Sequence, residues 1–70
     1  MYDYIFCFVK REDILLFVEL IKRFRSLRII ECEYDKKYKD YYIRMQKNLH
    51  IEDYGFNDFF ENFDMEYEPS

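Results

Sequence analysis

The 70-residue sequence has only one glycine, one proline and no tryptophan. Phosphate-binding loops need several residues without a Cβ, so a single glycine excludes a glycine-rich nucleotide-binding loop. No apolar run approaches the roughly 20 residues that a membrane-spanning helix needs. Asp3 precedes the first apolar run, and Lys10 and Arg11 follow it, which is not the pattern of a secretory signal. We therefore expect a cytoplasmic protein without membrane association.

Cysteine is also sparse, since Cys7 and Cys32 are the only two. Both lie in apolar stretches, where a reduced thiol packs as a small hydrophobic side chain. In a reducing compartment such thiols stay reduced. The sequence therefore favours two free thiols over a disulfide.

Groups that do chemistry are few. The single histidine, His50, is followed by Glu52 and Asp53, but three neighbours in one loop rarely converge on a metal ion, and no second cluster of ligands is present. No nucleophile has a base beside it, because Ser26 ends an expected helix and Ser70 ends the sequence. A chain of this length hardly forms a cleft for a catalytic carboxylate pair. We expect no enzyme, no cofactor and no metal site.

Apolar and aromatic residues are abundant: half of the residues are apolar, and 23% are aromatic. This content favours one folded domain over residues 1–70. A domain this small buries only roughly 60% of the surface that its unfolded chain exposes, so its stability is marginal. Dimerisation or partner binding would add stability.

Residues 12–27 form the longest segment with a helical period. Their apolar side chains cover an arc of about 200°, wider than the stripe that one sheet usually buries. Acidic residues begin the segment and basic residues end it, which matches the helix dipole. The expected helix would bury Ile14, Leu16, Phe17, Val18, Leu20, Ile21, Phe24 and Leu27.

Residues 2–9 alternate as in a strand that is apolar on both faces. One face is aliphatic, and we expect it to pack on the helix. The other face is aromatic and would remain on the opposite side of the sheet. The aliphatic face holds Ile5, Cys7 and Val9, and the aromatic face holds Tyr2, Tyr4, Phe6 and Phe8.

The remaining segments predict a hairpin, a second helix and a short strand. Residues 27–34 and 40–46 alternate with a period of two around a charged loop, with Ile30 and Cys32 sharing one face. Phenylalanines at helical spacing predict a helix over residues 52–63, and an edge strand would include Met65 and Tyr67. The resulting β-α-β-β-α(-β) order resembles the ferredoxin-like split βαβ topology: a compact α+β domain whose antiparallel sheet carries its helices on one face.

Charge divides the chain into two parts. Residues 1–50 form a mildly basic body with eleven basic and eight acidic side chains, whereas residues 51–70 form an acidic aromatic segment with seven acidic side chains and no Lys or Arg. Carboxylates spaced along a compact surface imitate the phosphates of nucleic acid and can occupy a basic groove. Aromatic side chains beside them would anchor the contact. The expected partner-binding residues are Glu52, Asp53, Tyr54, Asp58, Glu61, Asp64, Glu66, Tyr67 and Glu68.

In size and charge the chain resembles the small acidic proteins with which viruses and mobile elements block host nucleases or polymerases, including anti-CRISPR inhibitors. This resemblance implies a phage or mobile-element inhibitor or modulator that occupies a basic surface of a nucleic-acid-handling host protein.

Two alternatives use the aromatic strand face. In an RNA- or DNA-binding domain, Tyr4, Phe6 and Phe8 would stack on bases, helped by Arg44 and by the lysines of the charged loop, Lys36, Lys37 and Lys39. The missing sequence motif of RNA-recognition domains and a pI near 4.9 make nucleic acid the less favoured partner. In a structural homodimer, Tyr4, Phe6 and Phe8 would instead cover the same face of a second copy.

Overall fold

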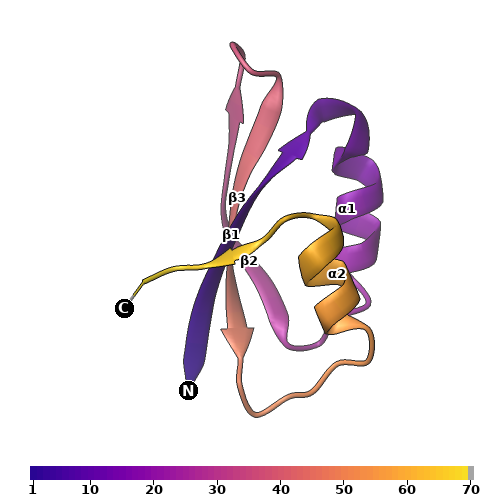
Figure 1. Cartoon of the computed structure of the whole chain (residues 1–70), viewed down its shortest axis with the longest axis vertical. Coiled ribbons are helices and arrows are strands. Elements are labelled where there is room, and N and C mark those ends of the chain that lie inside the picture. Colours follow the sequence, from indigo (N-terminus) through magenta and orange to yellow (C-terminus); the bar gives the residue numbers. More distant parts are fainter. Residues whose placement is uncertain (70) are drawn as a thin grey trace.

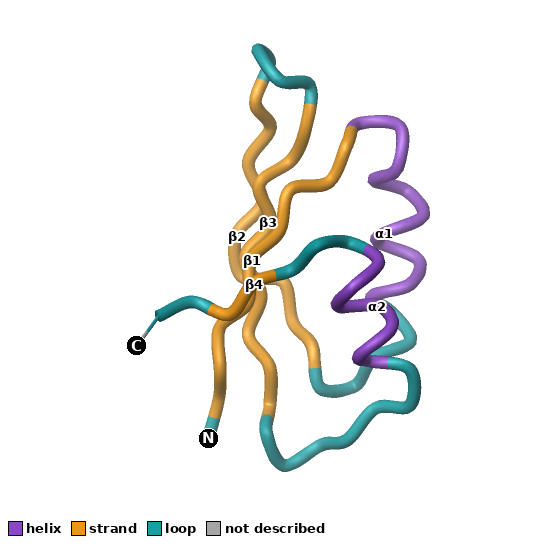
Figure 2. The backbone as a smooth tube through the Cα atoms, in the orientation of Figure 1, coloured by secondary structure: helices purple, strands orange, loops and turns teal. Residues whose placement is uncertain are grey.

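The computed structural model describes residues 1–69, which form a compact α+β domain. Its four strands form one antiparallel sheet in the order β2-β3-β1-β4. Both helices lie on the same side of this sheet (Figures 1 and 2). The elements are β1 (Tyr2–Lys10), a 3-10 turn (Arg11–Asp13), α1 (Ile14–Ile21), β2 (Leu27–Asp35), β3 (Asp40–Asn48), α2 (Phe56–Asn62) and β4 (Glu66–Tyr67). The expected α+β class, antiparallel sheet and pair of helices are confirmed.

The central strand β1 has the two faces that its sequence predicts. Ile5, Cys7 and Val9 are at most 2% exposed and form the middle of the core under the helices. Tyr4 and Phe8 are exposed on the opposite side of the sheet, which no helix covers. We call this side the open face. Because alternate residues of a strand point to opposite faces, helix packing on the aliphatic side leaves the aromatic side bare.

Helix α1 is shorter than the predicted helix over residues 12–27. It begins at Ile14, after the 3-10 turn, and ends at Ile21. The N–H groups of Arg23 and Phe24 then bond carbonyls only three residues back, at 3.0 Å each, and these bonds tighten the chain into a turn. Leu27 is buried, as predicted, but as the first residue of β2, where it pairs with Lys47. Sheet pairing therefore overrides the helical period at this end.

The buried face of α1 is narrower than the predicted apolar arc. Phe17 and Ile21 are its buried residues, whereas Leu16 is exposed. Leu15 is 79% exposed. A single layer of sheet together with the short α2 covers only part of a wide arc, so Leu16 points to solvent.

The β2–β3 hairpin forms around residues 36–39, as expected. The Asp35 carboxylate accepts hydrogen bonds from the N–H groups of Lys37 at 2.8 Å and Tyr38 at 3.2 Å, and so holds the turn. A bulge between Ile29 and Glu31 shifts the register on β3. The prediction that Ile30 and Cys32 share one face by unbroken alternation is therefore wrong, because the bulge interrupts it: Ile29 packs on the core, while Ile30 lies at the bulge and is exposed.

Helix α2 begins at Phe56, later than the predicted start at residue 52, because Gly55 takes a left-handed backbone conformation with φ of 83°. The predicted apolar face is present. The ring of Phe59 stacks on Phe17 at 5.5 Å and on Phe24 at 4.8 Å between ring centres. These contacts join the two helices over the core.

Strand β4 is the expected edge strand, although it is only two residues long. Glu66 and Tyr67 pair with Phe6 and Ile5 of β1. Met65, just before the strand, is buried in the core. Pairing with β1 therefore anchors the acidic C-terminal segment to the sheet.

Cys7 and Cys32 are both free thiols. Cys7 is buried, as predicted, but Cys32 is exposed, so the prediction that both pack as small hydrophobic side chains is wrong for Cys32. Both lie opposite Ile43, on the two neighbours of β3. Two strand spacings separate them by roughly 9 to 10 Å, beyond the Cα distance that a disulfide bridges. None of the helices in residues 1–69 is long and apolar enough to cross a membrane.

Candidate protein-interaction surface

Strand β4 divides the predicted partner-binding residues between the two faces of the sheet. Glu66 lies directly opposite Phe6, and the N–H of Glu68 bonds the Tyr4 carbonyl at 2.8 Å, so both glutamates belong to the open face. Tyr67 points the other way, and its ring lies 5.1 Å from that of Phe60 on α2. The acidic segment therefore does not present one continuous surface.

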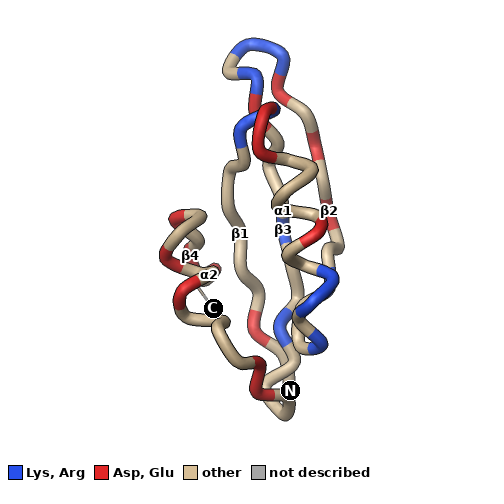
Figure 3. Tube along the Cα trace, turned by 90° about the vertical axis from the view of Figure 1, so that its right-hand side faces the viewer, with Lys and Arg blue, Asp and Glu red and all other residues tan. Residues whose placement is uncertain are grey.

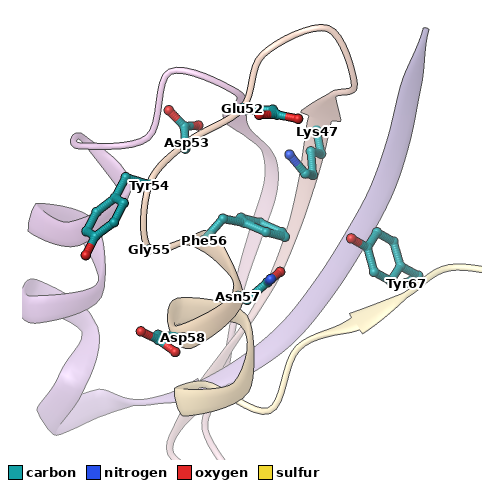
Figure 4. A pocket seen from close by; sticks show the side chains of 9 residues that line it. All are labelled: Lys47, Glu52, Asp53, Tyr54, Gly55, Phe56, Asn57, Asp58 and Tyr67. Carbon is teal, nitrogen blue, oxygen red and sulfur yellow. The ribbon is translucent and has the colours of Figure 1, made fainter.

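On the helix side, the segment between β3 and β4 surrounds an open hollow of about 550 Å³ (Figure 4). Five of the predicted partner-binding residues meet there. The hollow is lined by Lys47, Glu52, Asp53, Tyr54, Gly55, Phe56, Asn57, Asp58 and Tyr67. In this group Tyr54 is fully exposed, which makes it an aromatic side chain available to a partner.

Lys47 is the basic residue that lines this hollow, and it lies one residue beyond the predicted strand over residues 40–46. Its ammonium lies 4.3 Å from the ring centre of Phe56 and 3.4 Å from the Ser26 hydroxyl. It also faces Asp3 across the β1–β3 register. One more residue of strand alternation would have placed Lys47 on the same side as Met45. With these neighbours, Lys47 offsets part of the acidic charge around it.

Asp53 has a structural task within the chain. Its carboxylate accepts hydrogen bonds from the backbone N–H of Arg25 at 3.1 Å and of Ser26 at 2.8 Å, and so ties the loop before α2 to the turn after α1. Burial alone would raise the pKa of Asp53, but the hydrogen bonds from Ser26 and Arg25, with the charge of Lys47, lower it overall. Its carboxylate is therefore already engaged.

The other acidic side chains on this side of the sheet are exposed. Asp58 and Glu61 lie three residues apart on α2 and share a helix face. In residues 1–69, ion pairs join only Glu19 to Lys22 and Glu68 to Arg44, so the acids around α2 have no basic partner. Figure 3 shows acidic residues along α2 and β4, while basic residues gather at the tip of the β2–β3 hairpin and near the end of α1. We call Glu52, Asp58, Glu61 and Asp64 the acidic surface.

On the open face, Glu68 and Arg44 form a bidentate ion pair. Arg44 Nε lies 2.5 Å and Nη2 lies 3.1 Å from the two Glu68 oxygens. The guanidinium carbon also lies 4.9 Å from the ring centre of Tyr4. The hydrogen bonds from Arg44 lower the pKa of Glu68. This arrangement holds a guanidinium group between a carboxylate and an aromatic ring.

The aromatic residues predicted for self-association lie together on this face, and Tyr42 joins them. The rings of Phe6 and Phe8 have centres 6.4 Å apart, and the Tyr42 ring lies 5.5 Å from that of Phe8. Phe8 is 60% exposed, and Tyr4 is also exposed. Burial raises the pKa of Tyr42, and the nearby charges of Glu31 and Glu68 raise it further. Strand alternation alone could have found Tyr42, because it places this side chain on the face opposite Ile43.

The remaining candidate groups lie apart. His50 is exposed in the turn after β3, where its N–H bonds the Asn48 side chain at 2.9 Å. No group of three metal-ligating side chains occurs within residues 1–69. The hairpin lysines Lys36, Lys37 and Lys39 are all exposed.

Comparison with models of protein families, with curated proteins and with solved structures found no match. The interpretation of these surfaces therefore rests on their own geometry and charge. They belong to a small α+β domain with a helix-covered core, an acidic surface around α2 and a bare aromatic sheet face.

Proposed function

We propose that this protein is a non-enzymatic protein-binding module whose acidic surface occupies a basic surface of a nucleic-acid-handling host protein and inhibits or modulates it. The observation that supports this most directly is the set of exposed carboxylates around α2 that lack basic partners within residues 1–69. An uncompensated acidic patch attracts a basic groove over a long range and repels nucleic acid.

The surface also offers an apolar anchor. Tyr54 is fully exposed beside Asp58 in the hollow of Figure 4, and the Tyr67 ring borders the same hollow. Tyrosines at the centre of an interface contribute much of the binding energy, whereas rim charges mainly set the encounter rate and the choice of partner. The combination suits a protein partner with a basic surface that also has an apolar contact site.

We also propose a ferredoxin-like topology and a viral or mobile-element origin for this protein. The strand order β2-β3-β1-β4 supports a ferredoxin-like topology. Small size and acidic charge support a viral or mobile-element origin, acting in the host cytoplasm. The competing idea of a nucleic-acid-binding sheet meets an electrostatic objection, because Glu31, Glu33, Glu66 and Glu68 lie on the open face beside the aromatic rings.

The test is capture from a bacterial host lysate with the tagged protein, followed by mass spectrometry. The variant carries Asp58→Lys and Glu61→Lys. The control carries Glu12→Lys and Asp13→Lys in the 3-10 turn before α1, which change the net charge by the same amount. Both side chains are exposed and have no ion-pair partner within residues 1–69. Glu66 is left unchanged because it lies on the open face.

We expect the wild type and the control to capture a basic nucleic-acid-handling protein that the α2 variant does not retain. Added salt should weaken this capture, because solvent screens charges at an exposed interface. Equal capture by both variants would refute the role of the acidic surface. Circular dichroism of each variant establishes that it is folded before the comparison.

A further inference from the structure

A second hollow, of about 310 Å³, lies on the open face beside the β2–β3 hairpin. Aromatic rings from β1, β2 and β3 and carboxylates from β2 and β3 line it together, with one lysine. The lining residues are Phe8, Tyr42, Glu33, Tyr34, Asp35, Asp40 and Lys36. This hollow belongs neither to the acidic surface nor to the hollow beside α2.

We propose that this second hollow binds an arginine side chain of a partner protein. The guanidinium group stacks on Phe8 and Tyr42 and pairs with the carboxylate of Glu33. The proposal goes beyond the function proposed above, because it concerns the opposite face of the sheet and different residues.

The open face already holds one guanidinium group in this way. Arg44 donates two hydrogen bonds to Glu68, and its guanidinium lies over the Tyr4 ring. Phe8 and Tyr42 repeat the aromatic half of this arrangement, and Glu33 pairs with Tyr42 in the β2–β3 register, so its carboxylate lies on the same side. Here, however, no basic side chain pairs with the carboxylate in residues 1–69. A guanidinium group from outside would complete a second such arrangement.

The three carboxylates of the hollow are not equally available. Asp35 accepts the N–H groups of Lys37 and Tyr38. Asp40 lies opposite Lys10 in the β1–β3 register. Neither Asp40 nor Glu33 has a side-chain hydrogen bond or ion pair in the described part of the chain, but Asp40 is half-buried whereas Glu33 is exposed. Glu33 is therefore the most accessible carboxylate for a cation from outside.

The charge of the whole open face favours a cationic partner. Acidic side chains outnumber basic ones on this face according to the strand register. The acids are Glu31, Glu33, Asp35, Asp40, Glu66 and Glu68, and the bases are Lys10, Arg28 and Arg44, with Lys36 of the hairpin loop beside them. Two such faces repel each other and also repel a polyanion, whereas a basic protein segment is attracted. The raised pKa of Tyr42, caused by burial and then by Glu31 and Glu68, agrees with this acidic field.

Arginine fits the hollow better than lysine does. A guanidinium group is planar, stacks on aromatic faces and offers a fork of donors to a carboxylate, whereas an ammonium group is a compact and strongly hydrated charge. Lys36 at the edge of the hollow is such an ammonium, and its single charge does not neutralise three carboxylates. The rings of Phe8 and Tyr42 therefore favour arginine over lysine.

The test uses a capped Gly-Arg-Gly peptide and its counterpart with citrulline, which has nearly the same shape without the charge. Each peptide is titrated into the ¹⁵N-labelled full chain, and amide shifts are recorded by NMR. We expect saturable shifts at Phe8, Glu33 and Tyr42 with the arginine peptide and an affinity at least fivefold weaker with citrulline, as for a cation stacked on aromatic rings. Glu33→Gln should weaken the arginine peptide about threefold and Phe8→Ala about fivefold.

Matched controls come from α1, where Glu19→Gln removes an exposed carboxylate and Leu15→Ala an exposed apolar side chain. Both should leave the affinity unchanged. Equal shifts with citrulline, or shifts that map to α2, would overturn the proposal. So would self-association of the peptide-free protein in sedimentation equilibrium that Phe8→Ala abolishes, since a second copy would then occupy the face.

The experiment is separable from the test of the acidic surface. Asp58→Lys with Glu61→Lys should abolish capture of the basic protein but leave the affinity for the arginine peptide unchanged. Glu33→Gln should weaken peptide binding about threefold and leave the capture unchanged. If the peptide fails to bind the wild type, the arginine site is refuted while the acidic surface stands. If the α2 variant loses peptide binding while it remains folded, the assignment of the site to the open face is wrong.

Discussion

Removal of the Asp53 carboxylate should destabilise the fold far more than removal of any neighbouring acid. This side chain ties its loop to the turn after α1 by accepting hydrogen bonds from the backbone N–H groups of Ser26 and Arg25. These residues are 27 and 28 positions away in the sequence. Asp53→Ala leaves both donors without a protein acceptor. Ser26 is buried, so water replaces the carboxylate poorly there, whereas Arg25 is exposed and its N–H is readily hydrated.

The exposure of the two donors sets how much free energy of unfolding Asp53→Ala loses. A hydrogen bond to a charged acceptor contributes about 1.5 to 3 kcal/mol, and exposure lowers that figure at Arg25, so Asp53→Ala should cost about 2 kcal/mol. For a domain of this size that loss lowers Tm by about 8 to 16 °C. Asp53→Asn keeps one acceptor oxygen and should lose about half as much. The loss is a large part of a total stability of about 3.5 to 10 kcal/mol.

The assay is urea unfolding followed by circular dichroism, with Glu52→Ala as the matched control. Glu52 is the exposed neighbour of Asp53, and its replacement should change the free energy of unfolding by less than about 0.5 kcal/mol. Because the folded-state pKa of Asp53 is lowered, its contribution is complete above its unfolded pKa of about 3.9 and disappears as pH falls through the lower folded value. The difference between wild type and Asp53→Ala should therefore be constant from about pH 5 to 7 and shrink in acid. Equal stability of Asp53→Ala and Glu52→Ala at neutral pH would refute this reasoning.

Two further predictions concern the core. Burial raises the pKa of Cys7 to about 12, whereas Cys32 is exposed. A thiol reagent should therefore label only Cys32 in the native protein and both cysteines after unfolding. Rapid labelling of both in the native state would contradict the fold. Phe17→Ala should cost about 3 to 5 kcal/mol and leave much of the chain unfolded by circular dichroism. Leu15→Ala on the same helix should cost less than about 0.5 kcal/mol, and equal losses in the two variants would argue against the packing of α1.

Elements whose signals are local could be predicted from the sequence. In β1 one face is aliphatic and the other aromatic, so the sequence alone indicates which face of the strand packs on the core. The end of α1 could not, because Phe24 and Leu27 continue the helical period and only pairing of Leu27 with Lys47 shows where β2 begins. The bulge in β2 could not be predicted for the same reason. The adjacent Ile29 and Ile30 are equally apolar, and the register on β3 decides which one packs inward.

The candidate surfaces were predictable in composition but not in layout. The run of acids without Lys or Arg is visible in the sequence. Whether a given acid faces a partner depends on where β4 pairs, and this two-residue strand places Glu66 and Glu68 on the open face. Likewise, Arg44 and Glu68 are 24 residues apart, and no local pattern predicts their ion pair. Side-chain roles that depend on contacts between distant strands need the register as well as the residue type.

The position of β4 also determines which mutations can separate the two proposed surfaces. Charge reversal at Glu66 or Glu68 would alter the field of the open face as well as the total charge of the C-terminal segment, so these residues cannot discriminate between the surfaces. Asp58 and Glu61 on α2, and Phe8 and Glu33 on the open face, each act on one face alone. If one partner contacts both faces, either set of variants weakens the same complex, and effects at sites without shared contacts should add. If the two faces serve different partners, each set removes one partner and leaves the other bound.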